Sequence, residues 1–131
     1  PESYWGLGVI EYQSKNFKNA IELMNNALTL APNNPILMVD LATIYIQLGN
    51  NTVSPNQYTS KAKELINNAI YLQPEYETAY LQLALVNILE NDLDTAWKAF
   101  HKGVSLNPQE INQNILLELK SRKADPAGIY K

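Results

Sequence analysis

The chain has 131 residues, which is the size of one small domain, and its 46% hydrophobic and 18% charged residues are typical of a globular protein. Its net charge of −3 disfavours a nucleic-acid partner bound by phosphate neutralisation, and no apolar stretch is long enough to predict direct membrane contact. The absence of cysteine excludes disulfides and thiol catalysis, and a single histidine leaves few routes to metal or acid–base chemistry, so we expect no enzyme, no catalytic residues, no metal and no cofactor.

The first 34 residues predict two helices joined by a turn near Lys15. Gly8 in the first helix and Ala20 in the second are small enough to let the two helices approach closely. Pro32 follows the second helix, and proline cannot continue a helix. One face of that second helix carries apolar residues at helical spacing: Ala20, Ile21, Met24, Ala27 and Leu28.

A second helix pair is predicted over residues 35–76, with an insertion between its two helices. The insertion adds eight residues relative to the first pair. Within it, Ser54 can cap a helix whose first residue is Pro55. We therefore expect a loop over residues 50–54 and an extended second helix from about residue 55 to 72.

Residues 77–110 predict a third helix pair, and Trp97 and Phe100 fall on its packing stripe. The remaining residues, 111–131, begin with an amphipathic helix that we expect to cap the open surface of the last pair. Residues 124–128 are expected to end that helix, and the last residues of the chain are expected to be frayed. His101 is expected to be a surface or half-buried histidine without a role.

Four positions recur in phase in each of the three helix pairs, separated by seven, three and two residues. They are Ala20, Ala27, Leu30 and Pro32, then Ala62, Ala69, Leu72 and Pro74, then Ala96, Gly103, Leu106 and Pro108. Helix–turn–helix units of about 34 residues with this small-residue pattern and terminal proline resemble the tetratricopeptide repeat family. The resemblance implies an all-α fold, a right-handed superhelix of three units (1–34, 35–76 and 77–110) with a C-terminal capping helix (111–131), forming one domain over residues 1–131.

In this family the first helices of the units line a concave groove, and the resemblance carries this role to twelve residues of the chain. They are Trp5, Val9, Tyr12, Val39, Asp40, Thr43, Ile46, Gln47, Leu81, Gln82, Leu85 and Ile88. Gln13 occupies a further groove position of the first unit. Because this surface is largely apolar, the function implied is a protein–protein interaction module that binds a helical or apolar peptide segment.

The best-known use of the groove in this family is to hold a terminal carboxylate with Lys, Asn and Arg side chains. The corresponding positions here are Trp5, Val9, Asp40, Thr78 and Gln82. None of these residues is a cation, and Asp40 would repel a carboxylate. The sequence therefore excludes the carboxylate-holding mode.

An acidic group surrounds the third unit, formed by Glu75, Glu77, Glu90, Asp92 and Asp94. Carboxylate clusters can bind Ca²⁺, but this spacing lacks the alternating ligands and the glycine of a calcium loop. We interpret the group as a solvated face.

Three details resemble, more narrowly, the periplasmic tetratricopeptide domain of the cytochrome c haem-lyase accessory subunit: the unit count, the insertion, and the tail beginning with Ile111 and Asn112. This resemblance implies that the groove binds the C-terminal helix of an apocytochrome c, alongside haem-lyase components. It also implies a periplasmic location, after an N-terminal anchor absent from this fragment. The alternative is a generic scaffold or oligomerisation domain of a larger protein, with a groove occupied by the protein itself.

Overall fold

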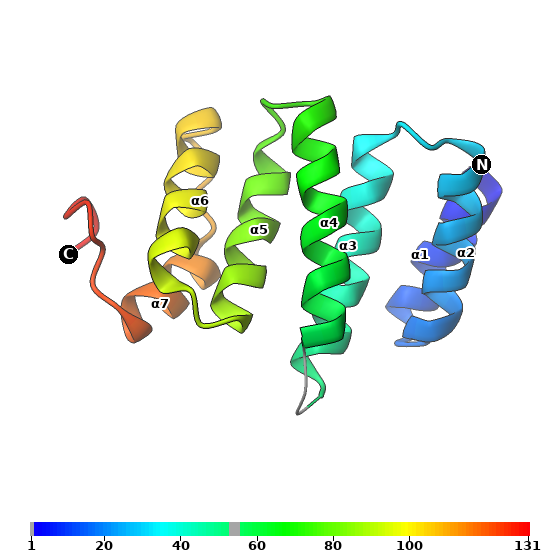
Figure 1. The fold of residues 1–131 in the computed structure, drawn as a ribbon, viewed down its shortest axis with the longest axis horizontal. Coiled ribbons are helices and arrows are strands. Elements are labelled where there is room, and N and C mark those ends of the chain that lie inside the picture. The colour runs from blue at the N-terminus through cyan, green and yellow to red at the C-terminus, as the bar shows by residue number, and fades with distance from the viewer. Residues whose placement is uncertain (1, 53–55) are drawn as a thin grey trace.

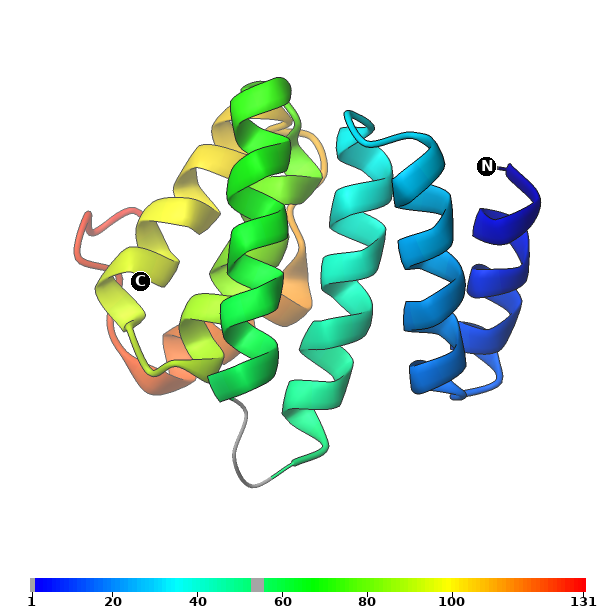
Figure 2. The same ribbon diagram turned by 45° about the vertical axis from the view of Figure 1, so that its right-hand side comes forward.

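The computed structural model describes residues 2–52 and 56–131, and over these ranges it contains seven α-helices and no strand. The helices are α1 (Glu2–Gln13), α2 (Phe17–Leu30), α3 (Pro35–Asn50), α4 (Asn56–Leu72), α5 (Glu77–Leu89), α6 (Leu93–Leu106) and α7 (Gln113–Arg122). Figures 1 and 2 show the three helix pairs arranged in a row in chain order, with α7 packed against α5 and α6 at one end. The predicted all-α superhelix of three helix pairs and a capping helix is confirmed.

Small residues lie where the paired helices approach most closely. Ala20, Ala62 and Ala96 are each 0% exposed, at the same position of the second helix in the three pairs. In the first pair, a Cβ atom added to Gly8 would lie 2.8 Å from Sδ of Met24. The periodic small residues therefore fix the phase of the repeat because any larger side chain would separate the helices.

The turns inside the first and third pairs have the same geometry. Lys15 and Asn91 adopt the left-handed conformation, with φ of 63° and 59°. In each turn the following amide reaches back over five residues, with Asn16 N donating to Glu11 O and Asp92 N to Asn87 O, both at 2.8 Å. This is the hydrogen bond of a Schellman motif, and it satisfies carbonyls that the helix end would leave unpaired. The turn predicted near Lys15 is confirmed.

The insertion of the second unit leads into α4, which begins at Asn56, close to the predicted residue 55. The predicted Ser54–Pro55 cap lies outside the described residues. The first turn of α4 is built into the core because Thr59 is 1% exposed and its hydroxyl donates to Asn56 O at 3.1 Å. Tyr58 stacks on Tyr45 of α3, with ring centroids 6.5 Å apart. The start of α4 is thus fixed to the preceding helix.

The two ends of the row of helices differ in how they meet solvent. On α1, Leu7 is 51% and Ile10 is 58% exposed. The residues at the same positions of α3, Leu41 and Ile44, are 1% and 3% exposed because α2 packs against α3. At the other end α7 buries Leu119 against the third pair, as predicted for a capping helix. One end is therefore closed and the other open.

The chain after α7 is docked rather than frayed, and this corrects two expectations. The Asp125 side chain is 0% exposed and accepts hydrogen bonds from the amides of Ala127, Ile129 and Tyr130 at 2.9 to 3.0 Å. Its Oδ1 atom also lies 2.8 Å from Nε2 of His101. His101, expected to have no role, therefore holds the tail to α6.

Aromatic stacking completes the docking of the tail. The His101 ring lies parallel to that of Tyr130, with centroids 5.7 Å apart, and it also stacks on Trp97 at 5.5 Å. The Trp97 indole N–H donates to Lys123 O at 3.0 Å. Periodicity could not reveal these contacts because they depend on single residues of an irregular segment.

The Asp125 contacts predict a pH-dependent stability. Burial by itself raises the pKa of Asp125, but hydrogen bonds from His101 and from the Tyr130 and Ala127 amides outweigh burial and lower the pKa below its ordinary value. Asp125 therefore makes its full contribution to the free energy of unfolding above the unfolded pKa of about 3.9. That contribution is lost as the pH falls through the lower pKa of the folded state.

We expect Asp125→Asn to reduce the free energy of unfolding by about 1–3 kcal/mol near neutral pH, because asparagine has one acceptor oxygen in place of the two that serve three amides and His101. The loss cannot exceed the free energy by which docking of the tail stabilises the folded chain. Urea unfolding of both proteins, followed by circular dichroism, measures the difference, which should shrink below about pH 4. Asp94→Asn is the control because its partner is the exposed Lys123. Equal effects of the two substitutions would contradict the role of Asp125.

Candidate peptide-binding groove

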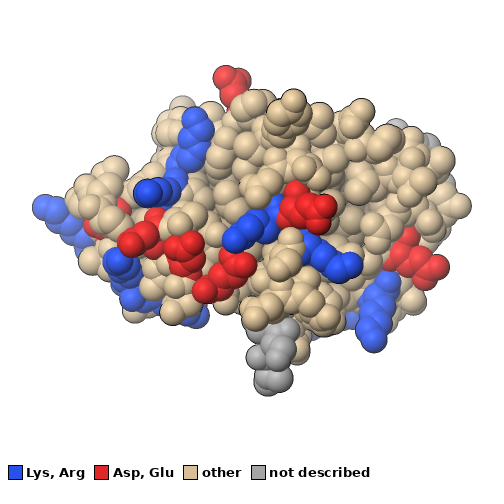
Figure 3. Space-filling model, viewed as in Figure 1, with Lys and Arg blue, Asp and Glu red and all other residues tan. Residues whose placement is uncertain are grey.

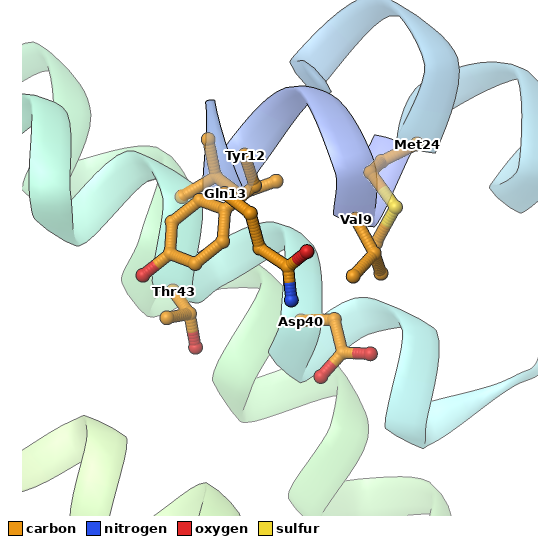
Figure 4. A pocket seen from close by; sticks show the side chains of 7 residues that line it. Val9, Tyr12, Gln13, Met24, Asp40 and Thr43 are labelled. Atoms are coloured by element: carbon orange, nitrogen blue, oxygen red, sulfur yellow. The ribbon is translucent and has the colours of Figure 1, made fainter. Parts of the chain in front are cut away.

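A pocket of about 310 Å³ opens between α1 and α3. Its lining residues are Val9, Tyr12, Gln13, Met24, Asp40, Thr43 and Ile44. Figure 4 shows Val9, Tyr12 and Gln13 on one side and Asp40 and Thr43 on the other, with Met24 beside Val9. The lining is mostly apolar, with a few polar groups at defined positions, as in sites that bind ligands or peptides. None of the lining residues comes from the docked tail.

Four of the twelve groove residues predicted from the sequence line this pocket. They are Val9, Tyr12, Asp40 and Thr43. Trp5 lies beside them because its indole N–H donates to Asp40 Oδ2 at 2.9 Å. Val9 is 37% exposed and is therefore accessible to a ligand. The half-buried residues Gln47, Gln82 and Leu85 are partly accessible but do not line the pocket.

Three predicted groove residues are wrong because they belong to the core. Val39 and Ile46 are each 1% exposed, and Ile88 is 6% exposed. The inner helices α3 and α5 are covered by helices on several sides, so most of their apolar positions are buried. Leu81 is only half-buried but turns towards α6, where its Cδ2 would lie 2.9 Å from a Cβ atom on Gly103.

Two lining residues escaped the sequence analysis, Met24 and Ile44. Met24 belongs to a second helix, which is not expected to face the groove, and it reaches the pocket beside Gly8. The glycine was the available signal because a residue without a side chain leaves room for the methionine of the facing helix. Ile44 carries no comparable signal, since its spacing is also that of a core residue.

Asp40 is the charged residue of the pocket and is partly withdrawn from water. Burial raises the pKa of Asp40 above its ordinary value, and the hydrogen bond from Trp5 offsets part of that increase. Burial, followed by the charge of Asp40, also raises the pKa of the Tyr76 phenol at the start of α5. The Asp40 carboxylate on α3 thus interacts with Trp5 of α1 and with Tyr76 at the start of α5.

The first helices carry no cation that could neutralise Asp40. The described segments α1, α3 and α5 contain no lysine or arginine, and all ten such residues of the chain lie elsewhere. Figure 3 shows, on the face seen in Figure 1, lysine and arginine side chains interspersed with aspartate and glutamate. Ion pairs of the described residues include Lys63 with Glu90 at 2.6 Å and Lys123 with Asp94 at 2.7 Å.

The other classes of site that the sequence raised have no support in the described ranges. Within residues 2–52 and 56–131, no group of three or more His, Cys, Asp or Glu side chains is placed to hold a metal ion. Over the same part of the chain, no helix combines the length and apolar character that crossing a bilayer requires. Two residues of the acidic group around the third unit, Glu90 and Asp94, form ion pairs with lysines, in keeping with a solvated face.

The fold and the groove define a helical-repeat protein built from stacked helix pairs. Residues 11–52 match the family described as tetratricopeptide repeat. The match covers the end of α1, the whole of α2 and α3, and the turns between them. Together with the repeat phase and the structural neighbours below, it supports the tetratricopeptide repeat family for this chain.

Two curated relatives match more than two thirds of this chain. The DnaJ homolog subfamily C member 7 homolog of Dictyostelium discoideum is 28% identical over 109 residues, which are 79% of this chain and 19% of that protein. The heat-shock protein cognate co-chaperone sgt12 of Aspergillus fumigatus is 31% identical over 90 residues, which are 69% of this chain and 24% of that protein. The chain therefore spans about a quarter or less of the length of these relatives.

Solved structures share the fold along most of the chain. The Sgt2 TPR domain from Aspergillus fumigatus has a TM-score of 0.77 and 25% identity, covering 92% of this chain and 75% of that one. The first TPR of Spaghetti (RPAP3), bound to the HSP90 peptide SRMEEVD, has a TM-score of 0.78 and 21% identity, covering 92% and 87%. These likenesses support a protein–protein interaction module, and they give no support to the narrower resemblance to a cytochrome c maturation subunit.

Proposed function

We propose that this chain binds a segment of a partner protein in the pocket between α1 and α3, as one interaction domain of a scaffold protein. The observation that carries the proposal is the accessible, mostly apolar pocket on first helices, where the exposed Val9 meets a half-buried carboxylate. An apolar groove with a few polar groups suits an extended or helical peptide. The tail, which could have filled the groove, is instead docked on α6.

The relatives raise a second possibility, the acidic chaperone tail. The Spaghetti (RPAP3) domain is bound to the HSP90 peptide SRMEEVD, but its 21% identity supports the fold alone. In this chain Asp40 faces the pocket, and no described first helix supplies a cation. Bringing an acidic peptide to this surface places like charges together in partly desolvated surroundings, which is unfavourable. We therefore propose that the partner segment is of a different kind.

The cytochrome-maturation hypothesis and the periplasmic location stay predictions. They depend on the narrower resemblance, which the relatives named above do not share. The C-terminal helix of an apocytochrome c remains one amphipathic segment that can be offered to the groove. The absence of enzymatic activity likewise stays a prediction.

Selection from a random-sequence peptide display library on the immobilised chain tests the proposed function. Selected peptides are synthesised, and their affinities are measured by calorimetry against the wild type and Val9→Glu. We expect Val9→Glu to weaken binding at least about tenfold, because it replaces an apolar contact in the pocket with a carboxylate that a bound peptide would desolvate, without disturbing the core. The synthetic peptide SRMEEVD is measured in parallel, with no binding expected.

Ile10→Glu is the matched control. It introduces the same side chain on the same helix, but Ile10 is 58% exposed and does not line the pocket. We expect its affinity for the selected peptides to equal that of the wild type, with unchanged circular dichroism for both variants. Failure to select any peptide that binds the wild type, or equal weakening by both substitutions, would overturn the proposal.

A further inference from the structure

The chemistry around Asp40 narrows the kind of segment that the groove accepts, on the basis of the function proposed above. Asp40 Oδ2 accepts the indole N–H of Trp5, and this is the one hydrogen bond that the described part of the chain gives to that carboxylate. Among the described ion pairs, none includes Asp40. The Asp40 carboxylate is thus bound by a neutral donor at one oxygen, and neither oxygen pairs with a cation in the described part of the chain.

A half-buried carboxylate in such a place is unusual because it loses hydration without gaining a charged partner. Asp40 lines a mostly apolar pocket together with Val9 and Ile44. The Trp5 indole N–H orients the carboxylate by binding one of its oxygens, and Figure 4 shows the Asp40 side chain on α3 across from Val9 and Gln13 of α1. A cation brought by a ligand would therefore meet an oriented acceptor at low cost in conformational entropy.

The polar groups beside Asp40 are consistent with the same preference. Thr43 donates its hydroxyl hydrogen to Val39 O at 2.9 Å, so its oxygen lone pairs remain to accept a hydrogen bond from a ligand. The Gln13 side chain also lines the pocket, and its amide can accept a hydrogen bond through its oxygen or donate one through its nitrogen. A lysine or arginine head group has several donors and no acceptor, which fits a carboxylate with neutral acceptors around it.

We propose that the partner is a peptide segment in which a lysine or arginine pairs with Asp40 and an adjacent apolar side chain enters the pocket beside Val9 and Met24. Such a segment carries the opposite charge to an acidic C-terminal tail. Since the first helices supply only carboxylates as charged groups in the described segments, charge complementarity selects against acidic segments and in favour of basic ones.

The test uses the strongest peptide from the selection described above, prepared with neutral ends in four forms. The residue opposite Asp40 is lysine, norleucine, citrulline or glutamate in otherwise identical peptides. Calorimetry with the wild-type chain should give the tightest binding for lysine, at least about tenfold weaker binding for the neutral forms, and none for glutamate. Binding of the lysine form should also weaken as sodium chloride is raised, because salt screens a partly exposed pair.

Asp40→Asn is the conservative variant because an asparagine oxygen can still accept the Trp5 indole N–H. It should bind the lysine and norleucine forms equally, and Asp40→Lys should bind the glutamate form better than the lysine form. Two results would overturn this inference and leave the proposed function standing. One is selected peptides that carry no lysine or arginine and yet bind Val9→Glu more weakly than the wild type. The other is an affinity of Asp40→Asn for the lysine form equal to that of the wild type. Absence of any peptide that binds the wild type would overturn both.

Discussion

A Val39→Glu variant is expected to lose most of its folding free energy near neutral pH. Val39 is 1% exposed and lies in the main core cluster on α3, so the new carboxylate would be buried without a cation. Such a burial costs on the order of 3–5 kcal/mol, which is a large part of the stability of a domain of this size. Urea unfolding followed by circular dichroism measures the loss.

The sign of the pH dependence provides a second readout for this variant. A buried glutamate has its pKa raised in the folded state, so folding favours the protonated form, and the destabilisation should grow as the pH rises above about 4.3. Thr43→Glu is the control on the same helix, since Thr43 is half-buried at the pocket. If Val39→Glu were as stable as Thr43→Glu, Val39 would lie on the groove surface and not in the core.

Trp97→Ala is expected to lower the free energy of unfolding by about 3–5 kcal/mol, as large-to-small changes of buried aromatic residues do. Trp97 is 1% exposed and packs edge-on against Phe100, with ring centroids 6.0 Å apart. Its indole N–H also holds Lys123 O. The substitution therefore removes core packing and one attachment of the tail together. Guanidinium chloride unfolding measures the first effect, and limited proteolysis of the tail the second.

Trp97→Phe separates the two contributions. It keeps an aromatic ring in the core but has no N–H to donate to Lys123 O, so proteolysis of the tail should accelerate while global stability falls less than in Trp97→Ala. If the tail of both variants resists proteolysis as well as that of the wild type, the docking described here does not depend on the indole.

The repeat phase could be predicted from sequence because the close contact between paired helices admits only small residues. Ala20, Ala62 and Ala96 recur at the same position, and each is 0% exposed. A constraint repeated three times along a chain leaves a periodic signal, and the helix boundaries follow from the turns and prolines on either side of it. The whole architecture therefore followed from a few small side chains.

The groove was predicted less well because face assignment by position treats every unit alike. Trp5 and Val39 occupy the same position of the first and second units and were both assigned to the groove, yet Trp5 is half-buried and Val39 is 1% exposed. The difference arises from the neighbours of each helix, since α3 is enclosed by other helices and α1 stands at the end of the row. Sequence spacing gives the direction of a side chain but not what covers it.

The contrast between the two ends of the row has a consequence for how the molecule opens. In a linear array each unit is stabilised by its immediate neighbours, so a terminal unit with an uncovered side separates first. Leu7 and Ile10 are uncovered on α1, whereas the other end is held by α7 and by the Asp125 contacts. Backbone amides of α1 should thus exchange with deuterium sooner than those of α6, and the partner, by contacting α1 and α3 together, would slow that exchange.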